Sequence, residues 1–337
     1  MTRRVLPAVL AMLVVLGLAA CGERKEPVAG TPATERVNLV LDFFPNADHA
    51  GLYAAIGTGE FKKAGLDVQP HTPSDPSAPL KLVAAGRADL AISYEPELLL
   101  ARAKGAKLVS IGAIVQKPLT SLISIGSKAI RAPGGLEGKK VGTAGIPYQD
   151  AYLKTIIRQA GIDGSRVHSI NLGFNLVPAL VSKRVDAVLG MFWNVEGVQL
   201  AREHKDPKIL RMEQIGVPTY NELIVVAREQ DVRSRGPLLR RFMRALARGH
   251  QRLRSDIASG VDELVKANPD LDSKLQRAQV KATLPVFFPA DRKKPFGFQD
   301  PEQWRRYAAW MSDNGLLSQP QIAQRAFTNE FLPGEGI

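Results

Sequence analysis

Residues 89–116 read DLAISYEPELLLARAKGAKLVSIGAIVQ, and their pattern decides the fold class. The apolar run at 89–93 predicts a strand, and the leucine-rich residues 97–104 predict a helix that Gly105 can end. A second apolar run at 107–116 predicts the next strand. Strand–helix–strand alternation is typical of an α/β fold with a largely parallel sheet.

The same alternation extends on both sides of this stretch. Further strands are predicted at 37–42, 65–68 and 121–124, within 136–142, and at 166–171, 186–189 and 223–227. Further helices are predicted at 49–63, 80–85, 150–160 and 175–182. From Gly236 onward the pattern is mostly helical. Two sheet-forming halves followed by helices predict two lobes, and a cleft between lobes is a natural place for a ligand.

The N-terminus predicts export. Residues 1–21 read MTRRVLPAVLAMLVVLGLAAC, in which two arginines precede an uncharged apolar run. That run suits a signal peptide and is short for a membrane-spanning helix, although a core helix is the alternative. Its end resembles a bacterial lipobox, which implies removal of residues 1–20 and lipidation of Cys21. Residues 21–36 have the composition of a flexible tether. We expect an extracytoplasmic protein anchored to a bacterial membrane, on the periplasmic side in a Gram-negative cell.

Composition excludes several classes of protein. The 337 residues include 45 Lys and Arg against 33 Asp and Glu, a net charge of +12, and 45% are apolar, too many for a disordered chain. The single cysteine excludes a disulfide scaffold and a multi-thiolate metal site. Basic residues late in the chain recur every three or four positions, which indicates solvated helix faces. We therefore expect no nucleic-acid partner, no metal and no cofactor.

Two stretches carry a resemblance to a known family. Residues 41–68, LDFFPNADHAGLYAAIGTGEFKKAGLDV, and 86–123, GRADLAISYEPELLLARAKGAKLVSIGAIVQKPLTSLI, resemble the thiamin-pyrimidine-precursor-binding (ThiY-like, NMT1/THI5-like) receptors of ABC importers. The likeness continues at 136–145, 174–190 and 328–332. The combination of FFPNADHAGLY with SYEPELLLARAKG is its specific part, because the other motifs occur across many solute receptors.

The resemblance implies a type II periplasmic-binding-protein fold with two lobes, a hinge and a ligand cleft between the lobes. Lobe 1 is expected at 37–122 and 228–337 and lobe 2 at 123–227, with the hinge near 120–126 and 223–230. The implied function is to deliver formylaminopyrimidine or hydroxymethylpyrimidine to an ABC permease and its ATPase. An alkanesulfonate, a nitrate-like anion or riboflavin is the alternative solute.

The family also contains hydroxymethylpyrimidine synthases, which consume their own histidine and use a lysine-bound pyridoxal phosphate and a cysteine-rich iron site. In this chain Ser93 aligns with that lysine and Glu97 with that histidine. Serine cannot form a Schiff base, and glutamate cannot supply an imidazole. The cysteine-rich segment is replaced by VPTYNEL at 217–223. We therefore expect a binding protein and not an enzyme, with a secreted enzyme of thiamin metabolism as the alternative.

An aminopyrimidine is a flat ring with nitrogen acceptors and an amine donor, so a fitting pocket offers aromatic faces, a carboxylate and amides. Such residues follow several predicted strands, where α/β proteins bind ligands. The candidates are Phe43, Asn46, Asp48, His49, Ser93, Tyr94, Glu95, Gly145, Tyr148, Asn175, Trp193, Asn194, Tyr220 and Glu222.

Within this set, Phe43, Tyr94 and Trp193 are candidates for stacking, and Glu95 and Glu222 for accepting from the amine. Each also has a structural alternative. These are a helix cap for Asp48, a packed ring for His49, a turn for Gly145, a solvated acid for Glu95, and core packing for the aromatic residues.

Overall fold

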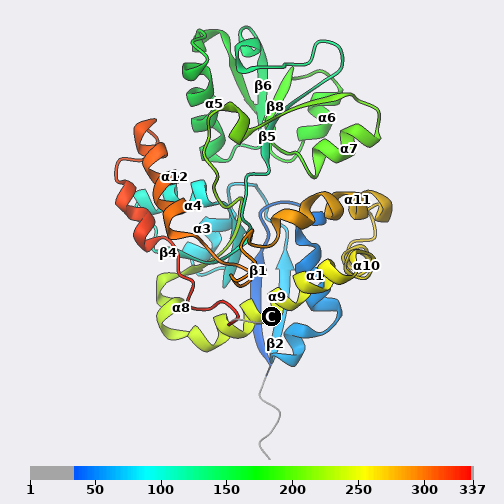
Figure 1. Ribbon diagram of the computed structural model, residues 1–337, viewed down its shortest axis with the longest axis vertical. Coiled ribbons are helices and arrows are strands. Elements are labelled where there is room, and N and C mark those ends of the chain that lie inside the picture. The colour runs from blue at the N-terminus through cyan, green and yellow to red at the C-terminus, as the bar shows by residue number, and fades with distance from the viewer. Residues whose placement is uncertain (1–33, 335–337) are drawn as a thin grey trace, which may run out of the picture. The chain divides into compact units, whose positions relative to one another are not determined.

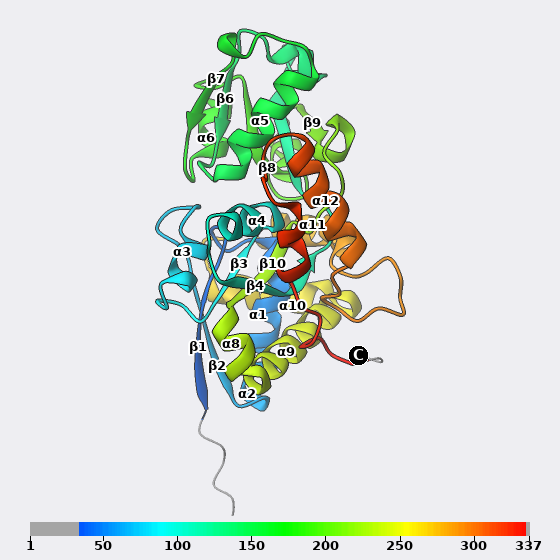
Figure 2. The same ribbon diagram turned by 90° about the vertical axis from the view of Figure 1, so that its left-hand side faces the viewer.

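The computed structural model describes residues 34–334, so the expected signal peptide, Cys21 and most of the tether lie outside the described residues. The part from Thr34 onward is one compact unit containing two five-stranded sheets, each flanked by helices (Figures 1 and 2). Between residues 34 and 334, no helix is both long enough and apolar enough to cross a membrane.

The first sheet has the strand order β2-β1-β3-β10-β4. Its strands are β1 (Glu35–Val40), β2 (Leu66–His71), β3 (Leu90–Ser93), β4 (Leu108–Val115) and β10 (Leu223–Arg228). Between these strands lie α1 (Ala50–Gly57), α2 (Glu60–Lys63), α3 (Pro79–Ala84) and α4 (Glu95–Ala103). β1 is parallel to β2 and β3, whereas β10 runs antiparallel to β3 and β4.

The second sheet has the related order β7-β6-β8-β5-β9. Its strands are β5 (Thr120–Ile125), β6 (Lys140–Thr143), β7 (His168–Asn171), β8 (Ala187–Phe192) and β9 (Pro207–Arg211). Its helices are α5 (Pro147–Gln159), α6 (Leu176–Val181) and α7 (Glu196–Arg202). β6 is parallel to β7 and β8, whereas β5 is antiparallel to β8 and β9.

Each sheet contains both parallel and antiparallel pairs, so the expectation of largely parallel sheets is wrong. The pairing also places the boundaries between the two sheets at other residues than expected. The chain crosses between the sheets twice, after β4 and before β10. Residues 120–122 pair in the second sheet, and residues 223–227 pair in the first, opposite to the expected division. Hydrophobic pattern identifies a strand but not the sheet that it joins, because the partners are distant in sequence. The half-buried β9 was not predicted.

The C-terminal third contains α8 (Glu229–Ser234), α9 (Gly236–Ser255), α10 (Ile257–Ala267), α11 (Ser273–Thr283) and α12 (Pro301–Asp313). α9 packs closely on α1, since a Cβ at Gly249 would lie 2.1 Å from the Gly51 carbonyl oxygen. α12 contacts the second lobe, where Tyr307 and Tyr152 of α5 are joined by their hydroxyl groups.

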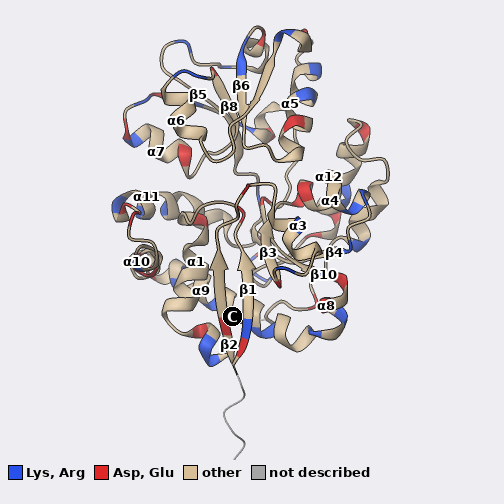
Figure 3. Ribbon diagram, turned by 180° about the vertical axis from the view of Figure 1, so that it is seen from behind, with Lys and Arg blue, Asp and Glu red and all other residues tan. Residues whose placement is uncertain are grey.

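Basic residues occur on helices of both lobes (Figure 3). On α9, three arginines are paired with acids: Arg240 with Glu330, Arg241 with Glu35, and Arg248 with Glu60. These pairs are partly exposed, which agrees with the solvated helix face that the spacing predicted.

Candidate functional site

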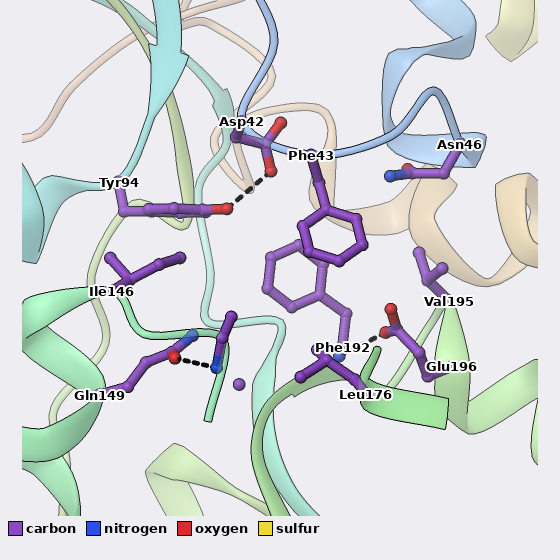
Figure 4. A pocket seen from close by; sticks show the side chains of 12 residues that line it. Asp42, Phe43, Asn46, Tyr94, Ile146, Gln149, Leu176, Phe192, Val195 and Glu196 are labelled. Atoms are coloured by element: carbon purple, nitrogen blue, oxygen red, sulfur yellow. Dashed lines mark hydrogen bonds between the residues drawn. The ribbon is translucent and has the colours of Figure 1, made fainter. Parts of the chain in front are cut away.

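A cavity lies between the two lobes, at the carboxyl ends of strands from both sheets (Figure 4). The first lobe contributes Asp42, Phe43, Asn46 and Tyr94. The second lobe contributes Ala144, Ile146, Gln149, Leu176, Gly190, Phe192, Val195 and Glu196. The only charged side chains in this lining are two carboxyl groups, Asp42 and Glu196.

Asp42 follows β1, and both of its oxygens take part in hydrogen bonds. The Tyr94 hydroxyl donates to Oδ2 at 2.8 Å, and His49 Nε2 lies 2.8 Å from Oδ1. The Asn46 backbone N–H donates to His49 Nδ1 at 3.2 Å, so Nε2 carries the proton and the ring is neutral. The Asp42 carboxylate is thus oriented by two donors, while lone pairs remain for an N–H group of a ligand.

The protonated state of the Tyr94 hydroxyl supports this arrangement. Burial, and then the charge of Asp42, raises the pKa of Tyr94 well above its usual value. The hydroxyl therefore keeps its proton and remains a donor to the carboxylate. Figure 4 shows this bond from the Tyr94 hydroxyl to the Asp42 carboxyl group.

Glu196 is the first residue of α7 and faces the cavity from the second lobe. Its Oε2 accepts from the Phe192 backbone N–H at 2.7 Å. Burial, with a smaller contribution from the charge of Asp42, raises the pKa of Glu196 to about 7, although the bond from Phe192 acts in the opposite direction. Near neutral pH the cavity therefore combines a carboxylate with a carboxyl group that can hold a proton.

Gln149 approaches the cavity because a glycine lies opposite. Its Oε1 accepts from the Ala144 N–H at 2.8 Å, which orients the amide. A Cβ at Gly190 would lie 2.3 Å from Gln149 Nε2, and Gly190 has a φ of +116°. Both the close approach and this backbone conformation require glycine at position 190.

Three aromatic rings point into the cavity: Phe43 and Tyr94 from the first lobe and Phe192 from the second (Figure 4). The Tyr94 and Phe192 rings are 6.4 Å apart and nearly perpendicular. Beside the cavity, Phe43 contacts Phe174 of the second lobe with a centroid distance of 4.8 Å. A flat ligand would therefore meet aromatic faces from both lobes.

Glu222 lies one layer behind the cavity, where the two crossover segments meet. Its Oε2 accepts from the backbone N–H groups of Leu119 and Thr120 at 2.6 and 2.7 Å, and from the Tyr220 hydroxyl at 3.0 Å. Its Oε1 accepts from the Thr120 hydroxyl, which also lies 3.2 Å from the Tyr148 hydroxyl. Glu222, Tyr220 and Tyr148 thus join the crossovers and do not line the cavity.

Glu95 is also buried at a crossover and is not a solvated acid. Its Oε2 accepts from the backbone N–H and the side-chain amide of Asn221, both at 2.7 Å. Burial raises the pKa of Glu95 to about 8. Ser93 lies nearby in sequence and donates to Glu97 at 2.6 Å, so the aligned lysine and histidine positions hold a serine–glutamate hydrogen bond.

Asp48 and Asn194 form a second contact between the lobes. Asn194 Nδ2 donates to Asp48 Oδ1 and lies equally close to the Thr283 hydroxyl, at 2.6 Å. Burial raises the pKa of Asp48 well above its usual value. The helix cap belongs to Asn46 instead, whose Oδ1 accepts from the Asp48 N–H.

The remaining candidates lie away from the cavity lining. Trp193 donates its indole N–H to the Pro118 carbonyl at 3.0 Å, and the Arg211 guanidinium lies 4.0 Å from its ring centroid. Asn175 is exposed before α6. Gly145 has a φ of +77° and occupies a turn.

Of the sequence candidates, the structure brings Phe43, Asn46 and Tyr94 to the cavity. The polar residues that the candidate set omitted are Asp42, Gln149 and Glu196. A carboxylate directly after the first strand was a usable signal, because strand ends converge on the cleft. No group of three or more potential metal ligands occurs among the residues from 34 to 334.

Comparison with known proteins agrees with this architecture. The sequence model of the NMT1/THI5 like family matches residues 46–256. A formylaminopyrimidine-binding protein of Halalkalibacterium halodurans is 33% identical over 94% of this chain and 96% of the relative. A 4-amino-5-hydroxymethyl-2-methylpyrimidine phosphate synthase of Aspergillus parasiticus is 23% identical over 89% of this chain and 88% of the synthase.

Solved structures show the same fold. The alkanesulfonate-binding protein of Xanthomonas axonopodis pv. citri has a TM-score of 0.68 at 17% identity, covering 89% of this chain and 99% of its own. The predicted two-lobe periplasmic-binding-protein fold is therefore confirmed. The higher identity to a binding protein than to a synthase, with Ser93 and Glu97 in place, also confirms the prediction of a non-enzymatic protein. The chain belongs to the NMT1/THI5-like family.

Proposed function

We propose that this protein binds an aminopyrimidine precursor of thiamin, such as formylaminopyrimidine or hydroxymethylpyrimidine, and delivers it to an ABC permease. The observation that carries the ligand class is the lining of the inter-lobe cavity, with aromatic rings, amides and two carboxyl groups and no cation. A 33% identical relative is a formylaminopyrimidine-binding protein, which supports the same class.

The chemistry of the ligand matches that of the lining. The exocyclic amine of an aminopyrimidine can donate to the Asp42 carboxylate, whose oxygens retain lone pairs. A protonated Glu196 can donate to a ring nitrogen, since burial keeps its pKa near 7. The rings of Phe43, Tyr94 and Phe192 provide faces for the flat heterocycle.

Delivery to a permease follows from a change in lobe arrangement. Solute binding favours the closed arrangement of the lobes, because the side chains of both lobes that contact the solute come together only there. The permease and its ATPase would recognise that closed form. The N-terminal sequence supports an extracytoplasmic location with a lipid anchor on Cys21.

An anionic solute fits the cavity less well. An alkanesulfonate or a nitrate-like anion would lie beside the Asp42 carboxylate with no lysine or arginine in the lining. The solved alkanesulfonate-binding protein shares the fold at 17% identity, a level that carries no ligand assignment.

Calorimetric titration of the purified protein tests the proposal. Formylaminopyrimidine, hydroxymethylpyrimidine, thiamin, riboflavin and an alkanesulfonate would be added in separate titrations. We expect a pyrimidine precursor to bind with a Kd of roughly 1 μM or lower, near −8 kcal/mol. Tight binding of the sulfonate or riboflavin, with no heat from either pyrimidine precursor, would overturn the proposed ligand while leaving the fold unaffected.

Glu196 should make this binding depend on pH. If its protonated form donates to a ring nitrogen, affinity is highest below a pH of about 7 and falls as the pH rises past that value. Glu196→Gln, which keeps an N–H donor at all pH values, should flatten the profile. Titrations between pH 5.5 and 8.5, corrected for ionisation of the ligand itself, would measure this, and an identical profile in both proteins would exclude the role.

A further inference from the structure

A second cavity, open to the surface, lies outside the inter-lobe site. α9 and α11 form part of its wall, and the segment between α11 and α12 completes it. Its charged lining residues are all cations: Arg254 of α9, Lys281 of α11, and Arg292 and Lys294 of the connecting segment. This composition is the reverse of the inter-lobe cavity, where the charged groups are acids.

These four cations lack partners within residues 34–334. None forms an ion pair or donates a side-chain hydrogen bond to another described residue. On the same helix α9, Arg240, Arg241 and Arg248 are each paired with an acid. Arg244 and Arg252 of α9 also form no ion pair with a described acid, but of these arginines Arg254 is the one that lines the cavity, so like charges gather there.

Aromatic rings lie against two of the cations, although Phe298, the ring beside Lys294, belongs to the adjoining cavity. The Arg254 guanidinium lies 5.1 Å from the Phe288 ring centroid, and Lys294 Nζ lies 4.7 Å from that of Phe298. Phe288 and the buried Phe296 both line the cavity, with centroids 6.0 Å apart. The two acids on this segment, Asp291 and Asp300, both line the adjoining cavity, where Asp291 accepts from the Lys293 N–H and Asp300 from the Glu302 N–H.

We propose that this basic cavity binds a phosphate-bearing ligand. Four unpaired cations around one concavity suit a group with two or more negative charges, and arginine presents forked donors that match phosphate oxygens. The rings of Phe288 and Phe296 offer a surface for an apolar part of the same molecule. The phosphate belongs either to the headgroup of an anionic phospholipid or to a soluble phosphate compound.

Two binding assays at low ionic strength distinguish the sources, because salt screens such contacts. Both use the Cys21→Ser protein, to which no acyl chain can attach at that position. One assay titrates inorganic pyrophosphate by calorimetry. The other measures sedimentation with vesicles of phosphatidylcholine alone or mixed with phosphatidylglycerol. Sedimentation with the mixed vesicles but not with phosphatidylcholine alone indicates that the ligand is the lipid headgroup. Saturable binding of pyrophosphate, with no preference between the vesicles, indicates a soluble phosphate compound.

The variant Arg254→Gln/Lys281→Gln should weaken whichever interaction is found by about tenfold or more, since it removes two charge-assisted contacts. Lys128→Gln/Arg131→Gln removes the same charge from exposed positions of the second lobe and should change it by less than about twofold. If both double variants weaken binding of the probe equally, the attraction depends on the overall charge of the protein, and the proposed site is overturned. Absence of saturable binding to either probe would also overturn it. Unchanged aminopyrimidine affinity in Arg254→Gln/Lys281→Gln would show that this variant is folded.

Discussion

Replacing Glu222 with alanine is expected to lower the free energy of unfolding by about 3 kcal/mol, because four buried donors then lose their acceptor. These are the N–H groups of Leu119 and Thr120 and the hydroxyls of Thr120 and Tyr220. They belong to both crossover segments, so the variant should also loosen the connection between the lobes. Urea denaturation followed by circular dichroism would measure the loss.

Glu222→Gln is the matched variant. Its amide oxygen can accept the two backbone N–H bonds, and the Thr120 hydroxyl can rotate to accept from the new amide, so we expect a loss of about 1 kcal/mol. A loss as large as that of alanine would mean that the charge, and not hydrogen bonding, holds the crossovers.

The same pair of proteins should differ in the pH dependence of stability. Burial raises the pKa of Glu222 from its usual 4.5 to about 7, so the folded state retains the proton over a range in which the unfolded state has lost it. This contribution to stability is complete below pH 4.5 and is lost as the pH rises to about 7. Glu222→Gln should therefore show a smaller decrease between pH 5 and pH 8.

Asp42→Asn is expected to weaken aminopyrimidine binding by roughly 10- to 100-fold, the range for losing a hydrogen bond to a charged acceptor. The amide would also place a second donor against either the His49 Nε2–H or the Tyr94 hydroxyl. Calorimetric titration with formylaminopyrimidine would give the change in Kd.

Asp270→Asn makes the same chemical change at an exposed position and should leave the Kd unaltered. Thermal unfolding of both variants would separate a binding defect from a folding defect. An Asp42→Asn protein that is stable and binds with wild-type affinity would exclude a contact between this carboxylate and the ligand.

Much of the architecture was predictable because it depends on local pattern. The strand–helix–strand alternation in 89–116 corresponds to β3, α4 and β4, and the repeat of this alternation predicted two lobes. The order of the strands within each sheet could not be predicted from this pattern. β10 lies between β3 and β4 in the first sheet, although it follows all the strands of the second sheet along the chain.

The candidate site was only partly predictable. Strand ends identified the correct loops, which include Phe43, Asn46 and Tyr94. Within those loops, neighbouring acids have different environments: Asp42 faces the cavity, whereas Asp48 is buried against Asn194. Glu222 was expected to contact the pyrimidine, but the structure places it against backbone N–H groups of the crossovers.

The sequence by itself determined the α/β class, the family and the residue types available to a ligand, since these follow from periodicity and from contiguous motifs. Only the tertiary structure decided which acid faces the cleft and which one joins the crossovers. A side chain's role there depends on its direction at the end of a strand and on partners from the other lobe. Glu196, for example, shares a cavity with Asp42 although the two residues are 154 positions apart along the chain.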